Sequence, residues 1–367
     1  MKLRTLLVGI LIWLASSSAT LADSAIEKLI AEARVKEGPV AVRDMPGWET
    51  PDKILVRELA PGLLDGLQQA FPSVEFVAVP SRVEAIRHAA DADAIIGFCT
   101  EDVLGAAIDA HWVQVYWAGV EGCVPLDAVK SGRVVLTNMQ KMSSPVLAEH
   151  AVSMVMSLAR GLIFQSKAMA SGEWQNRGWV TAHMQSLSSK TLLVVGLGGI
   201  GTEVAKRAAA LGMRVVATRR SSRVGPNYVD YVGLSDELHE LAASADFIVN
   251  TLPLTSETTG IFNAEFFATA KKGAYFVSIG RGASTVTADL TAALESGQIA
   301  GAGLDVTDPE PLPPDHRLWQ LENVIITPHV GGAGGSRERH RQLLLENIRR
   351  FIAGDALLNV VDPQRGY

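Results

Sequence analysis

The chain has 367 residues, of which 48% are hydrophobic and 20% are charged, and this composition is typical of a globular protein with two domains. Its formal net charge is −6 and it has no long basic run, so the sequence does not favour nucleic-acid binding. It contains neither a CxxC nor an HExxH motif, and we therefore expect no metal site.

The first 22 residues have the pattern of a secretory signal. Two basic residues precede an apolar stretch over 6–15, and small residues follow as far as Ala22. The apolar stretch is too short to span a membrane comfortably, so we expect residues 1–22 to be a signal peptide and the mature chain to have no stable membrane span. Export would place the protein in the periplasm or outside the cell. If translation starts downstream instead, for example at Met45, the protein is cytoplasmic.

Apolar runs that alternate with helical stretches predict a first α/β unit. The runs expected to form its strands are 53–57, 74–79, 94–98, 113–117 and 134–136. Cys99 and Cys123 each follow one of these strands. The sequence leaves open whether they form a disulfide in an exported protein or remain buried thiols.

A long apolar helix is expected over 145–162, where the chain enters a second α/β unit. His150 lies on this helix and is interpreted as structural. Residues 171–189 predict a less regular connection. Near the end of the chain, residues 337–353 predict another helix.

A glycine fingerprint lies between a strand and a helix in the second unit. The apolar run 191–195 predicts a buried parallel strand, GLGGIG occupies 196–201, and residues 202–211 predict a helix. This order of strand, fingerprint and helix is typical of a dinucleotide-binding turn.

Each glycine of the fingerprint has its own role in such a turn. Gly196 permits the tight turn, Gly198 lets the backbone approach a pyrophosphate, and Gly201 lets the helix pack against the strand. Gly199 and Ile200 belong to the same turn, where the helix N-terminus offers N–H groups and a positive dipole end to the phosphates.

The end of the following strand, predicted over 213–218, indicates which dinucleotide binds. An NAD site usually has an Asp or Glu about 20 residues after the fingerprint, where it accepts a hydrogen bond from the ribose 2′-OH. This chain has Arg219, Arg220 and Ser221 there instead. A guanidinium suits a 2′-phosphate, so NADP is favoured over NAD. The alternative interpretation is a solvated basic turn.

Three polar residues follow the fingerprint in order: Arg281 in IGRGA, Glu310 in DPEPL and His329 in TPHVGG. Hydride transfer to a carbonyl carbon builds negative charge on its oxygen, to which an imidazolium can donate a proton. A neighbouring carboxylate favours the protonated imidazole, and the planar guanidinium of arginine suits a substrate carboxylate. The three residues therefore predict reduction of a small 2-oxo acid. Each has a plainer alternative: Arg281 as a surface arginine in a turn, Glu310 as a solvated carboxylate and His329 as a histidine at the end of a strand.

Taken together, these motifs resemble the D-isomer-specific 2-hydroxyacid dehydrogenases. The resemblance runs from about residue 53 to residue 361 and rests on the fingerprint, SETTGIFNAEFFATAKKGAYFVSIGRGA, GAGLDVTDPEPLP, TPHVGG and a closing NVV, all in the family's order. The cofactor signal is closest to that of the NADP-using glyoxylate/hydroxypyruvate reductases.

The resemblance implies the fold and the domain organisation. We expect an α/β protein with two Rossmann-like or flavodoxin-like parallel-sheet domains and the active site in the cleft between them. Residues 53–145 with 332–367 would form the substrate (catalytic) domain, and 146–331 the dinucleotide-binding domain. The family also implies a homodimer.

The resemblance assigns the catalytic roles residue by residue. Arg281 corresponds to the arginine that holds the substrate carboxylate, His329 to the general acid–base, and Glu310 to the carboxylate that orients the histidine.

Further positions match the family by resemblance alone. Ala118 and Gly119 lie where a substrate loop offers N–H groups to the carboxylate, although Glu121 departs from the Asp or Asn that is common there. Asp305 matches a residue near the nicotinamide amide. Leu252 and Pro253 match a loop that covers the adenosine side of the cofactor.

Two functional classes remain: an NADP-dependent reductase of small 2-oxo acids, and a dinucleotide-sensing or scaffold protein in which catalysis is lost. The presence of all three polar residues favours the enzyme, because a sensor does not need them together. The sequence does not define the side chain of the substrate.

Overall fold

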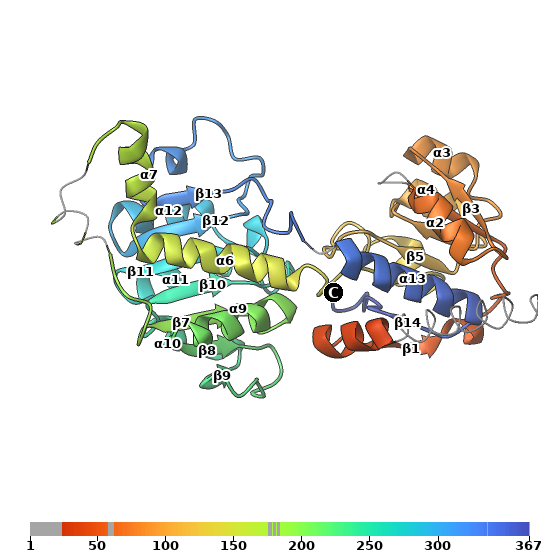
Figure 1. Ribbon diagram of the computed structural model, residues 1–367, viewed down its shortest axis with the longest axis horizontal. Coiled ribbons are helices and arrows are strands. Elements are labelled where there is room, and N and C mark those ends of the chain that lie inside the picture. Colours follow the sequence, from red (N-terminus) through yellow and green to blue (C-terminus); the bar gives the residue numbers. More distant parts are fainter. Residues whose placement is uncertain are drawn as a thin grey trace, which may run out of the picture. The chain divides into compact units, whose positions relative to one another are not determined.

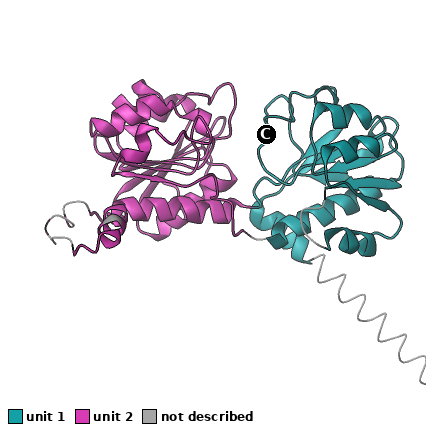
Figure 2. Cartoon of the chain, turned by 90° about the horizontal axis from the view of Figure 1, so that it is seen from above, with its two compact units in different colours: residues 1–142, 336–367 teal, residues 143–335 magenta. Residues whose placement is uncertain are grey.

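The computed structural model describes residues 24–57, 62–174, 178, 181, 184–335 and 337–366, so the expected signal over 1–22 lies outside the described residues. The chain divides into two compact units (Figure 2). Unit 1 consists of Met1–Met142 and Ser336–Tyr367, and unit 2 of Ser143–Gly335.

Unit 1 is built on a parallel sheet of five strands in the order β3-β2-β4-β5-β6. The strands are β2 (Lys53–Val56), β3 (Glu75–Ala78), β4 (Ala94–Ile96), β5 (Trp112–Gln114) and β6 (Val135–Thr137). All five predicted strands are present, with shifted ends. An antiparallel pair that the sequence did not indicate lies beside them and consists of β1 (Glu37–Ala41) and β14 (Ala356–Leu358).

Helices cover both faces of this sheet, which is why its strands are apolar on both sides. Leu55 packs in one core with α3, α4 and α5, whereas Ile54 and Val56 pack in another with α2 and α13. The helices are α2 (Leu63–Ala70), α3 (Arg82–Arg87), α4 (Glu101–Ala106), α5 (Asp127–Lys130) and α13 (Arg337–Ala353).

Cys99 and Cys123 form a disulfide in unit 1, with Cα atoms 5.7 Å apart. This resolves the choice that the sequence left open. The disulfide links the segment after β4 to the segment after β5.

Unit 2 contains a seven-stranded parallel sheet in the order β13-β12-β11-β10-β7-β8-β9 (Figure 1). Its strands are β7 (Thr191–Val195), β8 (Arg214–Thr218), β9 (Tyr231–Gly233), β10 (Phe247–Asn250), β11 (Ala274–Ser278), β12 (Ile299–Leu304) and β13 (Val324–Ile326). The strand order changes direction at β7, which has β8 on one side and β10 on the other. Ligands bind at such switch points, outside the carboxyl ends of the strands.

The two faces of the unit 2 sheet carry separate cores. Leu192 and Val194 of β7 pack with α6 and α9, whereas Leu193 and Val195 pack with α10, α11 and α12. The helices are α6 (Ser144–Ala159), α7 (Leu162–Ala170), α9 (Gly199–Ala210), α10 (Leu238–Ala242), α11 (Ala264–Thr269) and α12 (Thr287–Glu295). Short 3-10 helices also occur in the two units: η1 (Val42–Asp44), η2 (Ser235–Glu237), η3 (Gly282–Ser284) and η4 (Arg317–Gln320).

The single helix expected over 145–162 is wrong at its end. The α6 helix stops at Ala159, and α7 starts at Leu162 after a bend of 79°. Gly161 between them has a φ of +61°, a left-handed conformation that glycine adopts at little cost and that ends a helix.

No single helix in the described part of the chain is long and apolar enough to cross a membrane. Only the bent pair of α6 and α7 reaches the required length and hydropathy, and α6 is largely buried in the core of unit 2.

Candidate active site

The glycine fingerprint forms the turn between β7 and α9. Gly196 directly follows β7 with a φ of +95°, and Gly198 is the residue before the first helical turn. The helix begins at Gly199, three residues earlier than the sequence predicted. The N–H of Thr202 donates to the Gly198 carbonyl oxygen at 3.0 Å, so the rest of the fingerprint already belongs to the helix.

The three glycines differ in what surrounds them. A Cβ atom on Gly201 would lie 2.2 Å from the Gly196 carbonyl oxygen, and one on Gly196 would lie 3.0 Å from a methyl carbon of Leu252. A Cβ on Gly198 would meet no protein atom within 4 Å. Gly201 and Gly196 therefore serve packing, while Gly198 borders open space at a helix N-terminus that no side chain caps. This arrangement fits a pyrophosphate.

The loop after β10 lies against the fingerprint. Thr251 Oγ1 donates to the carbonyl oxygen of Gly196 at 2.6 Å, and Leu252 and Pro253 follow directly. These two residues are thus beside the fingerprint turn.

The basic turn follows β8. Arg219 donates from Nε to the Leu197 carbonyl oxygen at 3.0 Å and from Nη1 to the Val224 carbonyl oxygen at 2.9 Å. The guanidinium thereby links the fingerprint loop to its own turn, a contact that the sequence did not indicate. Arg220 and Ser221 are exposed next to it.

His329 and Glu310 form a hydrogen-bonded pair. Nδ1 of His329 lies 2.6 Å from Oε1 of Glu310, and the two side chains are 45% and 41% exposed. The carboxylate thus contacts the imidazole at Nδ1, and the second ring nitrogen, Nε2, takes no part in this contact.

A buried carboxylate fixes the turn that carries His329. Asp305, only 1% exposed at its side chain, accepts hydrogen bonds from the Thr327 hydroxyl at 2.5 Å and from the N–H groups of Val330 at 2.9 Å and Gly331 at 2.8 Å. His329 itself has a φ of +53°, and its N–H donates to the Asp305 carbonyl oxygen at 2.8 Å. Asp305 therefore holds the turn from both ends.

His150 of α6 joins the same network. Its Nε2 lies 3.0 Å from Thr327 Oγ1 and 3.5 Å from Asp305 Oδ1. No motif of the sequence indicates this contact between α6 and the turn after β13.

Arg281 lies in the turn after β11, and its Nη1 donates to the Gly280 carbonyl oxygen at 2.9 Å. A Cβ on Gly282 would be 1.8 Å from the Thr307 carbonyl oxygen, so this close approach of two loops requires glycine. The second loop leads directly to Glu310. Because β11, β12 and β13 are adjacent and parallel, the segments that carry Arg281, Glu310 and His329 all leave the sheet at its carboxyl edge.

Ala118 and Gly119 lie in unit 1, in the segment after β5. The Ala118 carbonyl oxygen accepts a hydrogen bond from Asn138 Nδ2 at 2.7 Å, and Ala118 itself is exposed.

Comparison with known proteins identifies the family. A family model described as D-isomer specific 2-hydroxyacid dehydrogenase, NAD binding domain, matches residues 152–331. The glyoxylate reductase of Korarchaeum cryptofilum is 32% identical over 297 residues, which cover 78% of this chain and 88% of that protein. The chain belongs to the D-isomer specific 2-hydroxyacid dehydrogenase family.

Solved structures are similar over most of the chain. One from Xanthobacter autotrophicus, in complex with NADPH and MES, has a TM-score of 0.75 and 28% identity, and the match covers 87% of this chain and 100% of that one. The NADPH-dependent glyoxylate/hydroxypyruvate reductase of Sinorhizobium meliloti, in complex with NADP and sulfate, has a TM-score of 0.73 and 28% identity, with 86% and 100% covered.

This 2-hydroxyacid dehydrogenase is therefore an oxidoreductase that transfers a hydride between a nicotinamide dinucleotide and a small 2-oxo or 2-hydroxy acid. When bound, the dinucleotide supplies or accepts the hydride. The His329–Glu310 pair at the carboxyl edge of unit 2 is suited to the accompanying proton transfer, because an imidazole paired with a carboxylate can donate or accept a proton.

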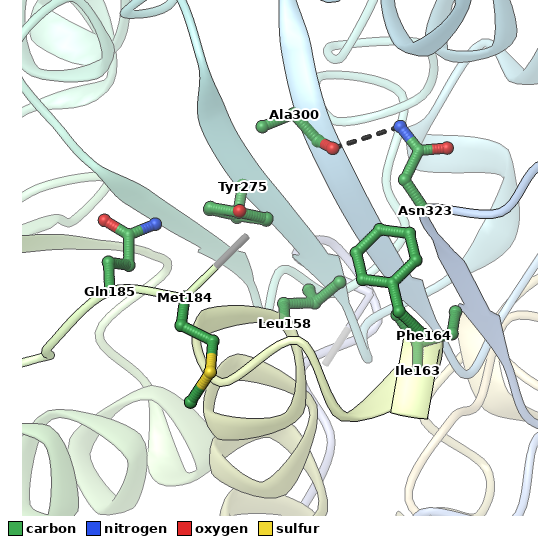
Figure 3. A pocket seen from close by; sticks show the side chains of 8 residues that line it. All are labelled: Leu158, Ile163, Phe164, Met184, Gln185, Tyr275, Ala300 and Asn323. Carbon is green, nitrogen blue, oxygen red and sulfur yellow. Dashed lines mark hydrogen bonds between the residues drawn. The ribbon is translucent and has the colours of Figure 1, made fainter. Parts of the chain in front are cut away.

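A separate pocket of about 340 Å³ lies near the amino ends of β11 to β13 in the 2-hydroxyacid dehydrogenase (Figure 3). It includes Tyr275, Ala300 and Asn323, and Asn323 Nδ2 donates to the Ala300 carbonyl oxygen at 3.0 Å. Apolar side chains of α6 and α7 complete much of the lining. The pocket is thus at the opposite end of these strands from Arg281 and His329.

Proposed function

We propose that this dehydrogenase uses NADPH to reduce glyoxylate, hydroxypyruvate or a similarly small 2-oxo acid. The substrate is suggested by the similarity to the glyoxylate reductase of Korarchaeum cryptofilum and the glyoxylate/hydroxypyruvate reductase of Sinorhizobium meliloti. The observation that carries the proposal is the 2.6 Å pair of His329 and Glu310 at the same sheet edge as the Arg281 turn.

In the proposed reaction, Arg281 binds the substrate carboxylate and aligns the carbonyl group. His329 donates a proton to the carbonyl oxygen as the hydride reaches the carbon, and Glu310 orients the imidazole and stabilises its protonated form. Backbone N–H groups at Ala118 and Gly119 would also bind the carboxylate.

The remaining roles concern the cofactor. Unit 2 would be the dinucleotide-binding domain and unit 1 the substrate domain. In unit 2 the fingerprint residues Gly196, Gly198, Gly199, Ile200 and Gly201 would hold the pyrophosphate, and Leu252 and Pro253 would cover the adenosine side. Asp305 would lie near the nicotinamide amide.

NADP rather than NAD is proposed because the turn after β8 offers guanidinium groups and no carboxylate. Arg219, Arg220 and Ser221 would contact the 2′-phosphate. The two carbonyl oxygens bound by Arg219 hold its guanidinium beside the fingerprint, which supports this role.

The reaction is tested by measuring kcat/KM for glyoxylate, hydroxypyruvate, pyruvate and phenylpyruvate with NADPH and with NADH. We expect turnover with NADPH to be fastest for glyoxylate and hydroxypyruvate, the two acids of this set that have no apolar side chain. A protein that binds NADPH but reduces none of these acids would instead be the dinucleotide-sensing or scaffold protein.

The cofactor preference is tested with Arg219→Asp. Hydrogen bonds to charged groups are worth roughly 1.5–3 kcal/mol, so the affinity for NADPH should fall about tenfold or more. The new carboxylate can accept from the 2′-OH of NADH, which moves the preference toward NADH.

Arg214→Asp is the matched control, because it makes the same charge change at the first residue of β8, at the other end of the strand. Its cofactor ratio should stay at the wild-type value. A wild type that prefers NADH, or equal ratios in both variants, would contradict the proposal.

We also propose that the protein is a homodimer, as the family resemblance implies. Leu162 and Met169, seven positions apart on one face of α7, are 51% and 78% exposed, and Trp174 is fully exposed shortly after them. Light scattering on the purified protein tests this, and a monomer mass would contradict it.

Export is proposed from the signal pattern of residues 1–22 and from the disulfide of Cys99 and Cys123, because disulfides persist in oxidising compartments. The mass of the protein purified from its native host tests this. An intact N-terminus would contradict cleavage.

A further inference from the structure

Arg57 lies at the carboxyl edge of the unit 1 sheet, directly after β2. β2 pairs with β4 and β4 pairs with β5, all parallel, so the segments that follow these strands leave the sheet at the same edge. Phe98 follows β4, and the proposed substrate loop with Ala118 and Gly119 follows β5. Arg57 is thus at the sheet edge that carries the proposed substrate loop.

The backbone around Arg57 is fixed by its neighbours. Its N–H donates to the Ile96 carbonyl oxygen at 2.8 Å, and its carbonyl oxygen accepts from the Tyr116 hydroxyl at 2.9 Å. A Cβ on Gly97 would lie 2.7 Å from the Cβ of Arg57, so the start of the side chain is closely packed. Arg57 therefore leaves the sheet edge in a defined direction.

The guanidinium of Arg57 lies over the aromatic ring of Phe98. Its central carbon lies 5.3 Å from the centre of the Phe98 ring, and Phe98 is buried. Stacking of this kind orients a guanidinium and leaves its N–H edge available. Among the residues that the structure describes, no carboxylate or carbonyl oxygen accepts a hydrogen bond from this side chain, although arginine has five N–H donors.

We propose that Arg57 is a specificity-determining residue that binds a second carboxylate, at the far end of a 2-oxo acid substrate. A planar carboxylate matches the fork of a guanidinium, and one partly buried against Phe98 is less hydrated than a free surface arginine. The enzyme then accepts 2-oxo dicarboxylic acids and distinguishes them from uncharged analogues of the same shape. This inference rests on the proposed function, because Arg57 acts on the same reaction.

The test uses two substrates of nearly equal shape. Oxaloacetate ends in a carboxylate where 4-methyl-2-oxopentanoate ends in a branched methyl pair. We expect the wild-type enzyme to have a kcat/KM at least about tenfold higher for oxaloacetate. Arg57→Gln should remove this preference through the KM for oxaloacetate and leave the values for 4-methyl-2-oxopentanoate and glyoxylate within about twofold. Arg57→Lys should recover only part of it, because an ammonium group does not make the two-pronged contact.

Arg87→Gln is the matched control, since it removes the same charge from an exposed side chain at the end of α3. Its substrate ratio should equal that of the wild type. NADPH affinity and the thermal unfolding temperature of each variant show whether the fold and the cofactor site are intact.

Any of three results would overturn the proposal. The first is a wild type that does not prefer oxaloacetate, and the second is an equal loss of kcat/KM for all substrates in Arg57→Gln. The third is an Arg87→Gln variant whose substrate ratio changes as much as that of Arg57→Gln. In each case reduction of glyoxylate by the wild type would leave the proposed function standing. Absence of any 2-oxo acid reduction would overturn both.

Discussion

At the residue scale, the direction of the His329 ring depends on a turn whose conformation is held from outside. A φ of +53° is uncommon for a residue with a side chain, and it persists here because Asp305 accepts hydrogen bonds on both sides of Pro328. The candidate acid–base group is therefore oriented by Glu310 at the ring and by Asp305 at the backbone.

Replacement of His329 by Ala should lower kcat by roughly 10²- to 10⁴-fold, because the proposed proton donor is lost while the hydride donor remains. NADPH binding, followed by its fluorescence, should stay close to the wild-type value. Glu310→Gln should lower kcat by a smaller factor, since an amide still orients the ring but lacks the negative charge. Unchanged turnover in a folded His329→Ala protein would remove this residue from the mechanism.

Arg281, Glu310 and His329 could be singled out from the sequence because each residue type suits one part of a single reaction. The contacts that position them could not. Asp305 meets Thr327 only because β12 and β13 are neighbours, and the need for glycine at Gly282 appears only once the loop with Thr307 lies against it. Such contacts depend on how turns from different parts of the chain pack together, and a local sequence pattern does not indicate this packing.

At the element scale, the parallel strands were predictable because strands buried on both faces are continuous apolar runs. Pairing of β1 with β14 joins opposite ends of the chain, and neither strand has a strong pattern of its own. The break after α6 depends on the left-handed φ of Gly161, which glycine allows but does not require. The parallel strands could therefore be recognised from the sequence, whereas the pairing of β1 with β14 and the break of the helix at Gly161 could not.

One carboxylate ties the starts of β7 and β10 together. Asp246 accepts from the Thr191 N–H at 2.9 Å and from Lys271 Nζ at 2.7 Å, and Lys190 Nζ lies 3.5 Å away. Burial raises the pKa of Asp246, but the hydrogen bond from Lys271, that from Thr191 and the nearby positive charges outweigh it and leave the pKa below its ordinary value of 3.8. The ionised form is therefore favoured in the folded protein.

This pKa gives a pH-dependent contribution to stability. Because the folded pKa is depressed, the contribution is fully present above 3.8 and is lost as the pH falls through the folded pKa. Asp246→Asn should lower the unfolding temperature at pH 7, by roughly 2–4 °C for each kcal/mol lost, and the difference should shrink in acid. Asp236→Asn, at an exposed carboxylate in η2, is the control and should change little. A difference that does not depend on pH would contradict the charge-based explanation.

At the scale of the whole molecule, the two units differ in how the chain builds them. Unit 2 is continuous, and apolar clusters on both faces of its sheet consist of its own residues. Unit 1 needs the end of the chain, because the Phe351 ring of α13 lies 5.1 Å from that of Trp112 and buried Asn347 donates to Gln114 Oε1 at 3.1 Å.

We therefore expect residues 143–335, expressed alone, to fold and to bind NADPH within about tenfold of the affinity of the full chain. They should not reduce 2-oxo acids, because they lack Ala118 and Gly119, which we propose bind the substrate carboxylate. A chain that ends at residue 335 should keep a folded unit 2 but lose unit 1, since removal of one fully buried Phe already costs about 3–5 kcal/mol and here a whole helix is lost. Circular dichroism, thermal unfolding and NADPH fluorescence measure these outcomes. An unfolded 143–335 fragment, or a cooperative single transition with intact unit 1 in the truncated chain, would show that stability is distributed differently between the units.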